Sequence, residues 1–333
     1  MKKIFAIILV CALALTMLAA CSEKEDSSAD NQSPPSTQNS SSNQSNDSAT
    51  QSNNSSPSQS PAAEQSPPTA QAAAISNFSG YISVITREEG SGTRDAVRDL
   101  FNIKDADGKE NVTPEAMVQD STGNLMTAVA GDPNAIGYCS LASLNDTVKA
   151  LSIDGVDATS ANVKNGSYKI QRPFYLATMG EADGLAKDFI EFILSAEGQT
   201  AATKRCIPVD DKAPAYSGSA PAGRIVVGGS SSVSPVMADL IAAYKDVNPN
   251  AEIELQESDS SKGMSDAKSG AYDIGMASRE LKDSEKEDGL IPVYIAIDGI
   301  AVIVNSANPL TGLSVDQVRS IYNGEFEDWA DVQ

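Results

Sequence analysis

Arg87-Glu88-Glu89-Gly90-Ser91-Gly92-Thr93-Arg94 is the stretch that decides the fold, and a counterpart lies far downstream in Gly229-Ser230-Ser231-Ser232-Val233-Ser234-Pro235. Each stretch places glycine and small hydroxyl residues at the start of a segment with the apolar spacing of an amphipathic helix. Backbone N–H groups at a helix start are unpaired, and the positive end of the helix dipole favours an anion there. The two stretches together predict an oxyanion site.

The start of the chain predicts where the protein resides. Charged residues at 2–3 precede an apolar core at 4–18 that is too short for a membrane span, and Leu18-Ala19-Ala20-Cys21 resembles a lipobox. We therefore expect a lipoprotein signal peptide over residues 1–21, with lipidation of Cys21 and an anchor on the extracytoplasmic face of the cell membrane. The alternative is an ordinary cleaved signal peptide.

Residues 22–77 are mostly Ser, Asn, Gln, Pro, Ala and Thr, a composition that predicts a disordered tether because it offers too few apolar side chains to bury. The remaining residues, 78–333, are enough for one or two compact lobes. The chain has 24 Lys and Arg against 45 Asp and Glu, which argues against a nucleic-acid partner.

Histidine is absent, which excludes Ser-His-Asp and Cys-His catalysis and histidine-based zinc sites. We expect no metal and no cofactor. Only Cys139 and Cys206 belong to the predicted folded body, and each lies in an apolar, strand-like run. Two separate buried thiols are favoured over a disulfide between them.

Apolar patterns alternate between strand and helix periods. This alternation implies an α/β architecture with ligands at the carboxyl ends of the strands. The expected strands are residues 81–86, 135–138, 148–153, 224–227, 273–277 and 295–305, with a further one around Ile253 and Leu255, and the expected helices are 93–101, 185–194 and the segment that Pro235 begins.

Taken together, seven segments resemble the phosphate-binding proteins of phosphate ABC importers: residues 86–94, 135–138, 172–176, 189–199, 273–281 and 298–305, and the loop of Ser230. The resemblance covers residues 81–332. It implies an α/β, two-lobed, periplasmic-binding-protein-like (type II) fold with a ligand cleft between the lobes. It also implies a monomeric, non-enzymatic receptor that captures inorganic phosphate and delivers it to the permease subunits and their ATPase.

The order of these segments departs from that family, in which the Ser230-type loop and the 273–305 segments come first. The chain resembles a circular permutant whose old termini are joined through residues 210–223, although a truncated duplication would show the same order. Permutation implies one lobe from about 81–167 plus 306–333 and another from about 168–305. The hinge would then lie near residues 172–176 and 303–305.

The resemblance also assigns the site. Arg87 would pair with the anion directly, since a guanidinium matches a tetrahedral oxyanion, and Glu89 would hold Arg87 in place. The simpler interpretation is that the hydroxyl residues only cap helices. The full ligand set is Arg87, Ser91, Gly92, Thr93, Ser231, Ser232, Ser260 and Arg279.

Arg279 is a departure, because some family members carry at that place an Asp that accepts the proton of hydrogen phosphate. Arg279 therefore either binds the anion or pairs with Asp298 or Glu280. We expect one of these two carboxylates to supply the missing acceptor and so to favour phosphate over sulfate.

The sequence is also compatible with other functions. The receptor could take another oxyanion, such as sulfate or molybdate, or act as a phosphate sensor. An enzyme using Ser91 or Ser231 as a nucleophile is disfavoured, because the sequence places no histidine or suitably spaced lysine to activate either serine.

Overall fold

The computed structural model describes residues 78–332, and the predicted signal peptide, tether and Cys21 lie outside the described residues. The strands are β1 (Ser83–Arg87), β2 (Met117–Gln119), β3 (Ala135–Ser140), β4 (Val148–Ala150), β5 (Ser152–Ile153), β6 (Gln171–Met179), β7 (Ile207–Pro208), β8 (Gly223–Ser230), β9 (Ala251–Ser258), β10 (Ile274–Ala277), β11 (Leu290–Asn305) and β12 (Gly312–Leu313). The helices are α2 (Gly92–Leu100), α3 (Thr122–Gly131), α4 (Ser160–Lys164), α5 (Gly184–Ile193), α6 (Ala196–Ala202), α7 (Ser234–Val247), α8 (Ser260–Ser269), α9 (Asp283–Glu287) and α10 (Val315–Tyr322), with a 3-10 helix at Trp329–Val332.

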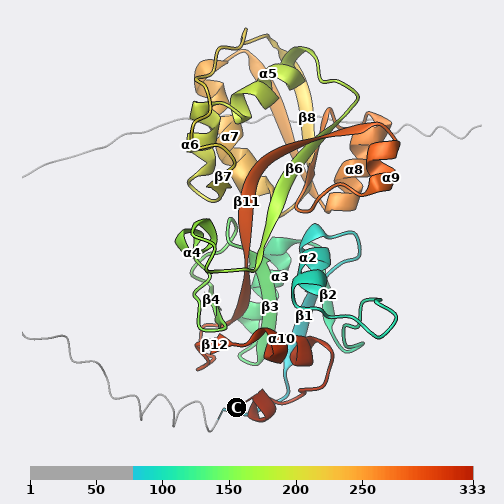
Figure 1. The fold of residues 1–333 in the computed structure, drawn as a ribbon, viewed down its shortest axis with the longest axis vertical. Coiled ribbons are helices and arrows are strands. Elements are labelled where there is room, and N and C mark those ends of the chain that lie inside the picture. The colour runs from blue at the N-terminus through green and yellow to red at the C-terminus, as the bar shows by residue number, and fades with distance from the viewer. Residues whose placement is uncertain (1–77, 333) are drawn as a thin grey trace, which may run out of the picture. The chain divides into compact units, whose positions relative to one another are not determined.

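Strands β6 and β11 run between the two lobes of the described residues (Figure 1). They pair antiparallel from Leu290 opposite Met179 to Gly299 opposite Gln171, and β11 then continues to pair with β3 and β4. The main sheet has the order β2-β1-β3-β11-β6-β10-β8-β9. Because β11 is shared by both lobes, it fixes the sheet of one lobe to the sheet of the other.

The apolar side chains form two large cores, one in each lobe. The first lobe packs around β1, β3 and the end of β11, and it includes Trp329 and α10. The second lobe packs around β8, β10, α5 and α7, together with the start of β11 and the part of β6 from Phe174 on. A smaller cluster in the second lobe lies beneath α8.

The position of the crossing differs from the expectation. Residues 303–305 were expected at the hinge, and 168–305 in one lobe. In the structure Ile300 to Val304, and also Tyr168 and Ile170, belong to the first core, whereas Phe174 and Ala296 belong to the second. The reason is that β11 is a single strand of 16 residues. Its apolar run passes without interruption from one core to the other, so sequence pattern does not mark the border.

Most of the expected elements are present. The helices expected at 93–101 and 185–194 are α2 and α5, and Pro235 lies in the first turn of α7. The strand expected at 148–153 is divided into β4 and β5, because β4 pairs with β11 whereas β5 pairs with β12. Cys139 and Cys206 are free and buried, as predicted, and burial raises the pKa of both thiols.

The two ends of the described chain lie side by side in the first lobe. The backbone N–H of Gly80 donates to Asp328 Oδ1 at 2.9 Å, and Tyr81 forms an isolated antiparallel bridge with Asp328. The buried Trp329 donates from Nε1 to the carbonyl oxygen of Asn134 at 3.0 Å. The last segment of the chain is therefore part of the lobe that the first strand begins.

Residues 210–223 are fastened to the second lobe through the buried carboxylate of Asp188 on α5. It accepts hydrogen bonds from the hydroxyl of Tyr216, from the backbone N–H of Ser219 at 2.8 Å and from the hydroxyl of Tyr244 at 2.5 Å. Burial acts to raise the pKa of Asp188, but these hydrogen bonds outweigh it and the pKa is lowered. This connection is therefore held as part of the lobe.

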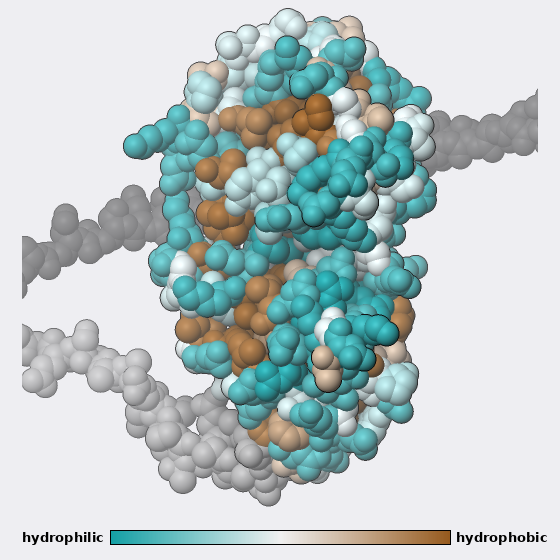
Figure 2. Space-filling model, turned by 45° about the vertical axis from the view of Figure 1, so that its right-hand side comes forward, coloured by the Kyte–Doolittle hydropathy of each residue, from teal (hydrophilic) through white to brown (hydrophobic). Residues whose placement is uncertain are grey.

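The outer surface is largely hydrophilic on the face shown in Figure 2, with hydrophobic side chains interspersed in both lobes. Within residues 78–332, no helix is both long and apolar enough to cross a bilayer, and no group of three or more Cys, Asp or Glu side chains is arranged to hold a metal ion.

Candidate functional site

Hydroxyl-rich starts of helices from both lobes meet where the lobes are in contact. Thr93 of α2 and Thr122 of α3 belong to the first lobe, and Ser231 and Ser232 precede α7 in the second. Thr93 Oγ1 lies 2.8 Å from Ser232 Oγ, and Thr122 Oγ1 lies 3.0 Å from Ser231 Oγ and 3.1 Å from Ser232 Oγ. The backbone N–H of Thr122 donates to Ser231 Oγ at 3.2 Å. The lobes are thus in contact through hydroxyl groups.

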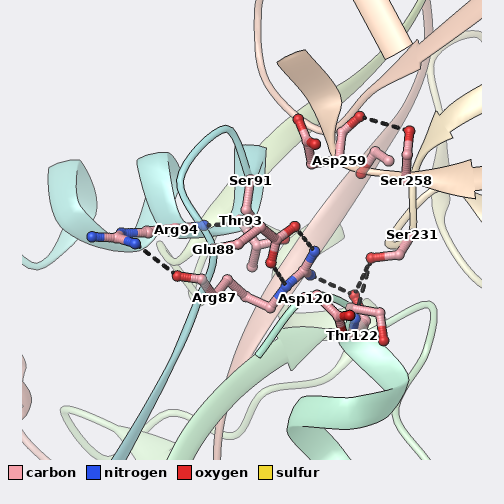
Figure 3. Close-up of polar contacts among 12 residues, drawn as sticks. Arg87, Glu88, Ser91, Thr93, Arg94, Asp120, Thr122, Ser231, Ser258 and Asp259 are labelled. Carbon is pink, nitrogen blue, oxygen red and sulfur yellow. Dashed lines mark hydrogen bonds and ion pairs between the residues drawn. The ribbon is translucent and has the colours of Figure 1, made fainter. Parts of the chain in front are cut away.

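Arg87 ends β1 and is only 2% exposed. Its Nη1 donates to Thr122 Oγ1 at 2.9 Å, and its Nε and Nη2 both donate to the carboxylate of Glu88 at 2.7 Å (Figure 3). Arg94 Nη1 donates to the carbonyl oxygen of Arg87 at 2.9 Å, which fixes the backbone at the strand end. A buried guanidinium therefore faces the same hydroxyl cluster.

The partner of Arg87 is not the one expected. Glu89 was predicted to hold Arg87, but Glu89 is exposed and Glu88 makes the ion pair. Alternation along a strand would place residues 87 and 89 on one face. However, β1 ends at Arg87 and the chain turns at Glu89 and Gly90, where Gly90 has a φ of 95°. The turn removes Glu89 from the side of the sheet on which Arg87 lies.

The other predicted ligands of the α2 loop and the second lobe lie at this contact. Ser91 is the buried N-cap of α2, and its Oγ accepts from the backbone N–H of Arg94 at 3.4 Å. Ser260 begins α8 and its Oγ accepts from the backbone N–H of Ser278 at 3.1 Å. Gly92 is in such close contact with the other lobe that an added Cβ would lie 2.6 Å from Ser260 Oγ and 2.8 Å from Ser278 Oγ.

A second buried arginine reaches the hydroxyl cluster from the crossing strands. Arg172 Nη1 donates to Thr93 Oγ1 at 2.6 Å and to Ser278 Oγ at 3.2 Å, while Nε and Nη2 donate to Asp298 Oδ2 at 3.2 and 3.1 Å. Asp298 Oδ1 accepts from Ser140 Oγ at 2.8 Å and from the backbone N–H of Ala142 at 3.3 Å. Burial raises the pKa of Asp298 to about 6, although Arg172 and the other donors act in the opposite direction.

Asp298 and Glu280 do not fit the expected role of phosphate acceptor. Asp298 is 0% exposed, and its carboxylate is enclosed by Arg172, Ser140 and the backbone of Ala142, so it has no accessible side for an anion. Glu280 is exposed. The expectation failed because Asp298 lies opposite Arg172 in the β6–β11 ladder, and that register gives it a buried partner.

Arg279 pairs with neither of the two carboxylates considered for it. Its Nη1 and Nη2 donate to Glu285 at 2.9 and 2.8 Å, and Nη2 also donates to Ser261 Oγ at 3.2 Å. Its Nε lies 3.6 Å from Asp95 of α2 in the other lobe. The capping turn of α9 brings Glu285 close to Arg279. Arg279 thus joins the two lobes beside the hydroxyl cluster, and its contacts are made with protein groups.

Sequence reasoning missed Glu88, Thr122, Arg172 and Ser278. For Thr122 a signal was available, since Ser121-Thr122-Gly123 has the composition of a helix start, and Ser121 is the N-cap of α3. Arg172 and Ser278 lie within segments that carry the family resemblance, 172–176 and 273–281. However, nothing adjacent to either residue in the sequence indicates that they contact each other.

Comparison with known proteins identifies the family. A family model described as a PBP superfamily domain matches residues 42–197 and 214–333. The phosphate-binding protein PstS 2 of Streptococcus agalactiae serotype V is 46% identical over 263 residues, which cover 77% of this chain and 89% of that protein. The chain belongs to the phosphate-binding proteins. It therefore has the mixed α/β fold of periplasmic-binding-protein-like receptors, and the expectation that it is not an enzyme agrees with this membership.

A solved structure and a more distant relative complete the comparison. The crystal structure of a phosphate-binding protein of a phosphate ABC transporter from Streptococcus pneumoniae TIGR4 has a TM-score of 0.60 and 40% identity. The match covers 76% of this chain and 100% of the Streptococcus pneumoniae chain. The phosphate-binding protein PstS of Bacillus subtilis is 36% identical over 133 residues, which are 39% of this chain and 42% of that protein. The family is thus matched along the whole folded body by some members and in one block by another.

Proposed function

We propose that this protein captures inorganic phosphate between its two lobes and passes it to the permease subunits of a phosphate ABC importer. The observation that carries the proposal is the buried guanidinium of Arg87 beside a cluster of hydroxyl groups contributed by both lobes. The PstS 2 relative supports the choice of anion, because its name states that it binds phosphate.

The cleft supplies what a desolvated oxyanion needs. Arg87 uses one N–H of Nη1 and one of Nη2 on protein partners, so each nitrogen retains a second donor for an anion. The hydroxyls of Thr93, Ser231 and Ser232 and the N–H groups at the start of α2 add further donors. Because these donors come from both lobes, an anion bound to all of them holds the lobes together.

Glu88 is the carboxylate that we propose as acceptor for the proton of hydrogen phosphate. It lies on Arg87 and is 21% exposed, so it can shift when an anion enters. Each of its oxygens has a second lone pair. Sulfate has no proton to donate and would be repelled by Glu88, which favours phosphate.

Nucleophilic catalysis receives no support from these contacts. Within residues 78–332, Ser91 Oγ accepts from the backbone N–H of Arg94, and Ser231 Oγ contacts only Thr122. Neither contact can remove a proton from the serine, so activation of the hydroxyl lacks a base.

We also propose that the chain is a circular permutant of the more common family order, with one lobe from about 78–170 plus 300–332 and the other between them. Two observations support this. The Bacillus subtilis relative matches only one block of the chain, as expected if the order of blocks differs. The contacts of Gly80 and Tyr81 with Asp328 join the ends within one lobe, as a permutation requires and as the truncated-duplication alternative does not.

The amino-terminal residues suggest how the receptor is kept near its permease. We propose that Cys21 is lipidated and anchors the protein on the extracytoplasmic face of the membrane, with residues 22–77 as a tether of about 40 Å average reach. The folded body would then remain as a monomer close to the importer.

Calorimetry of the protein with phosphate, sulfate and molybdate tests the proposed function. We expect phosphate to bind most tightly, and Arg87→Ala to weaken its binding by about 2 to 5 kcal/mol, because that change removes the buried cation and leaves Glu88 without its partner. Glu88→Gln should reduce the difference between the binding affinities for phosphate and for sulfate. Equal binding of the anions by the unmodified protein would favour a less selective oxyanion receptor, and no binding of phosphate would refute the proposal.

Closure of the lobes is tested by Gly92→Ala. The added methyl group would collide with Ser260 and Ser278 across the cleft, so phosphate should bind about 1 to 3 kcal/mol more weakly and contract the protein less in small-angle X-ray scattering. Gly123→Ala is the matched control, because Gly123 also lies in the first turn of a helix, α3, but an added Cβ there would have no atom within 4 Å. Similar contraction in both variants would contradict closure at this contact.

Reordering the chain tests the permutation. A chain that runs from 223 to 332, continues through a short linker into residue 78 and ends at 209 should fold as a monomer, with phosphate affinity within a few-fold of the original. If the reordered chain aggregates or does not fold, the present order of segments is required, and the ends of the chain cannot be joined as the permutation proposes.

Membrane fractionation tests the anchor. The full chain should sediment with membranes and incorporate a labelled fatty acid, whereas Cys21→Ala should abolish the labelling. Equal labelling of both proteins would show that Cys21 is not the modified residue.

A further inference from the structure

We propose that Arg172, held by Asp298, is a positioning residue that orients two hydroxyl groups as hydrogen-bond donors toward the anion site, Thr93 directly and Ser260 through Ser278. This inference rests on the proposed capture of phosphate and adds to it a pair that lies behind the hydroxyl groups. It separates two roles, one for a guanidinium that faces the anion and one for a guanidinium that prepares the groups around it.

The pair lies where the strands pass from one lobe to the other. Arg172 on β6 and Asp298 on β11 are opposite each other in the antiparallel ladder. The side chains are 2% and 0% exposed. Residues just beyond them along the strands, Phe174 and Ala296, pack in the second core, whereas Ile170 and Ile300 pack in the first. The ion pair therefore lies between the two cores, behind the hydroxyl cluster.

The direction of the hydrogen bonds supports an orienting role. A guanidinium has donors and no acceptor. Since Arg172 Nη1 donates to Thr93 Oγ1 at 2.6 Å, one lone pair of that oxygen is occupied and the hydroxyl hydrogen of Thr93 is directed away from Arg172, where Ser232 Oγ lies 2.8 Å from Thr93 Oγ1. That acceptor is in the opposite lobe. An anion in the cleft would receive the same hydrogen.

In the second lobe, Arg172 contacts the hydroxyl of Ser278 in a similar way. Ser278 Oγ accepts from Arg172 at 3.2 Å and from Ser230 Oγ at 2.9 Å. Its own hydrogen is left for Ser260 Oγ at 3.4 Å, and Ser260 Oγ also accepts from the backbone N–H of Ser278. The hydrogen of Ser260 is then free for an acceptor in the cleft. Arg172 thus sets the polarity of two donor chains, one in each lobe.

Asp298 keeps Arg172 in this orientation and balances its charge. It occupies Nε and Nη2, which leaves Nη1 as the nitrogen that faces the hydroxyls. Ser140 and the backbone of Ala142 hold the carboxylate from the first lobe. Because the pair has no net charge, we expect it to act on the anion through the geometry of Thr93 and Ser278.

The test replaces the pair with apolar residues. Removing both charges together avoids leaving one buried charge unpaired, so Arg172→Met combined with Asp298→Leu should stay folded, with an unfolding temperature lowered only by the loss of the acceptor for Ser140 and Ala142. We expect calorimetry to show phosphate affinity about 100-fold weaker, because two donor groups lose their orientation. A merely structural role would leave the affinity unchanged once the stability is retained.

Two further variants complete the experiment. Arg224→Met with Glu254→Gln removes an exposed ion pair that contacts neither Arg172, Asp298 nor the hydroxyl cluster, and its phosphate affinity should stay within about twofold of the original. Arg172→Lys keeps the charge and loses the fork geometry, and should weaken phosphate binding about tenfold. If the double variant with apolar residues at 172 and 298 does not fold, Arg172→Lys alone tests the positioning role.

The outcomes separate the inference from the function on which it rests. If the unmodified protein binds phosphate but neither the apolar pair nor Arg172→Lys weakens binding, the positioning role is overturned and the receptor function stands. If the unmodified protein does not bind phosphate, the proposed function itself fails.

Discussion

Positive charge buried between two lobes is the constraint on which this structure depends. A buried cation is costly unless it has a well-placed partner. Arg87, Arg172 and Arg279 are all buried, and each has its own carboxylate; the first two contact the hydroxyl cluster. Glu88 is partly exposed and can yield to a ligand, whereas Asp298 is enclosed by strands of both cores. This difference in burial is the basis of the two proposed roles, in which Arg87 is shared with an anion and Arg172 stays fixed.

The sheet turns this local chemistry into a two-lobed receptor. Strands β6 and β11 run through both lobes and hold them side by side. The starts of α2 and α3 in the first lobe therefore face the starts of α7 and α8 in the second. Hydroxyl groups of both lobes meet there, so under the proposed function an anion that binds to all of them would bring the lobes together. Arg279 adds a contact of the same kind, since it joins Glu285 in its own lobe to Asp95 in the other.

Features set by adjacent residues, such as helix starts and strands, could be predicted from the sequence. Contacts between residues far apart in the chain could not. The helix start at Ser91 and the strand before it follow from adjacent residues, and the family resemblance identified the lobes and most of the hydroxyl groups. The exchange of Glu89 for Glu88 depends on where β1 ends, within one residue. Arg172 is 79 residues from Thr93 and 126 from Asp298, and only the register of β6 with β11 brings them together.

A crystal structure of the protein grown with phosphate would test the central claim most directly. We expect an anion enclosed between the lobes, with Arg87 and the hydroxyls of Thr93, Ser231 and Ser232 within hydrogen-bond distance. Arg172 should lie behind Thr93 and make no contact with the anion. A phosphate bound elsewhere, or bound to only one lobe while the cleft stays open, would contradict the central claim.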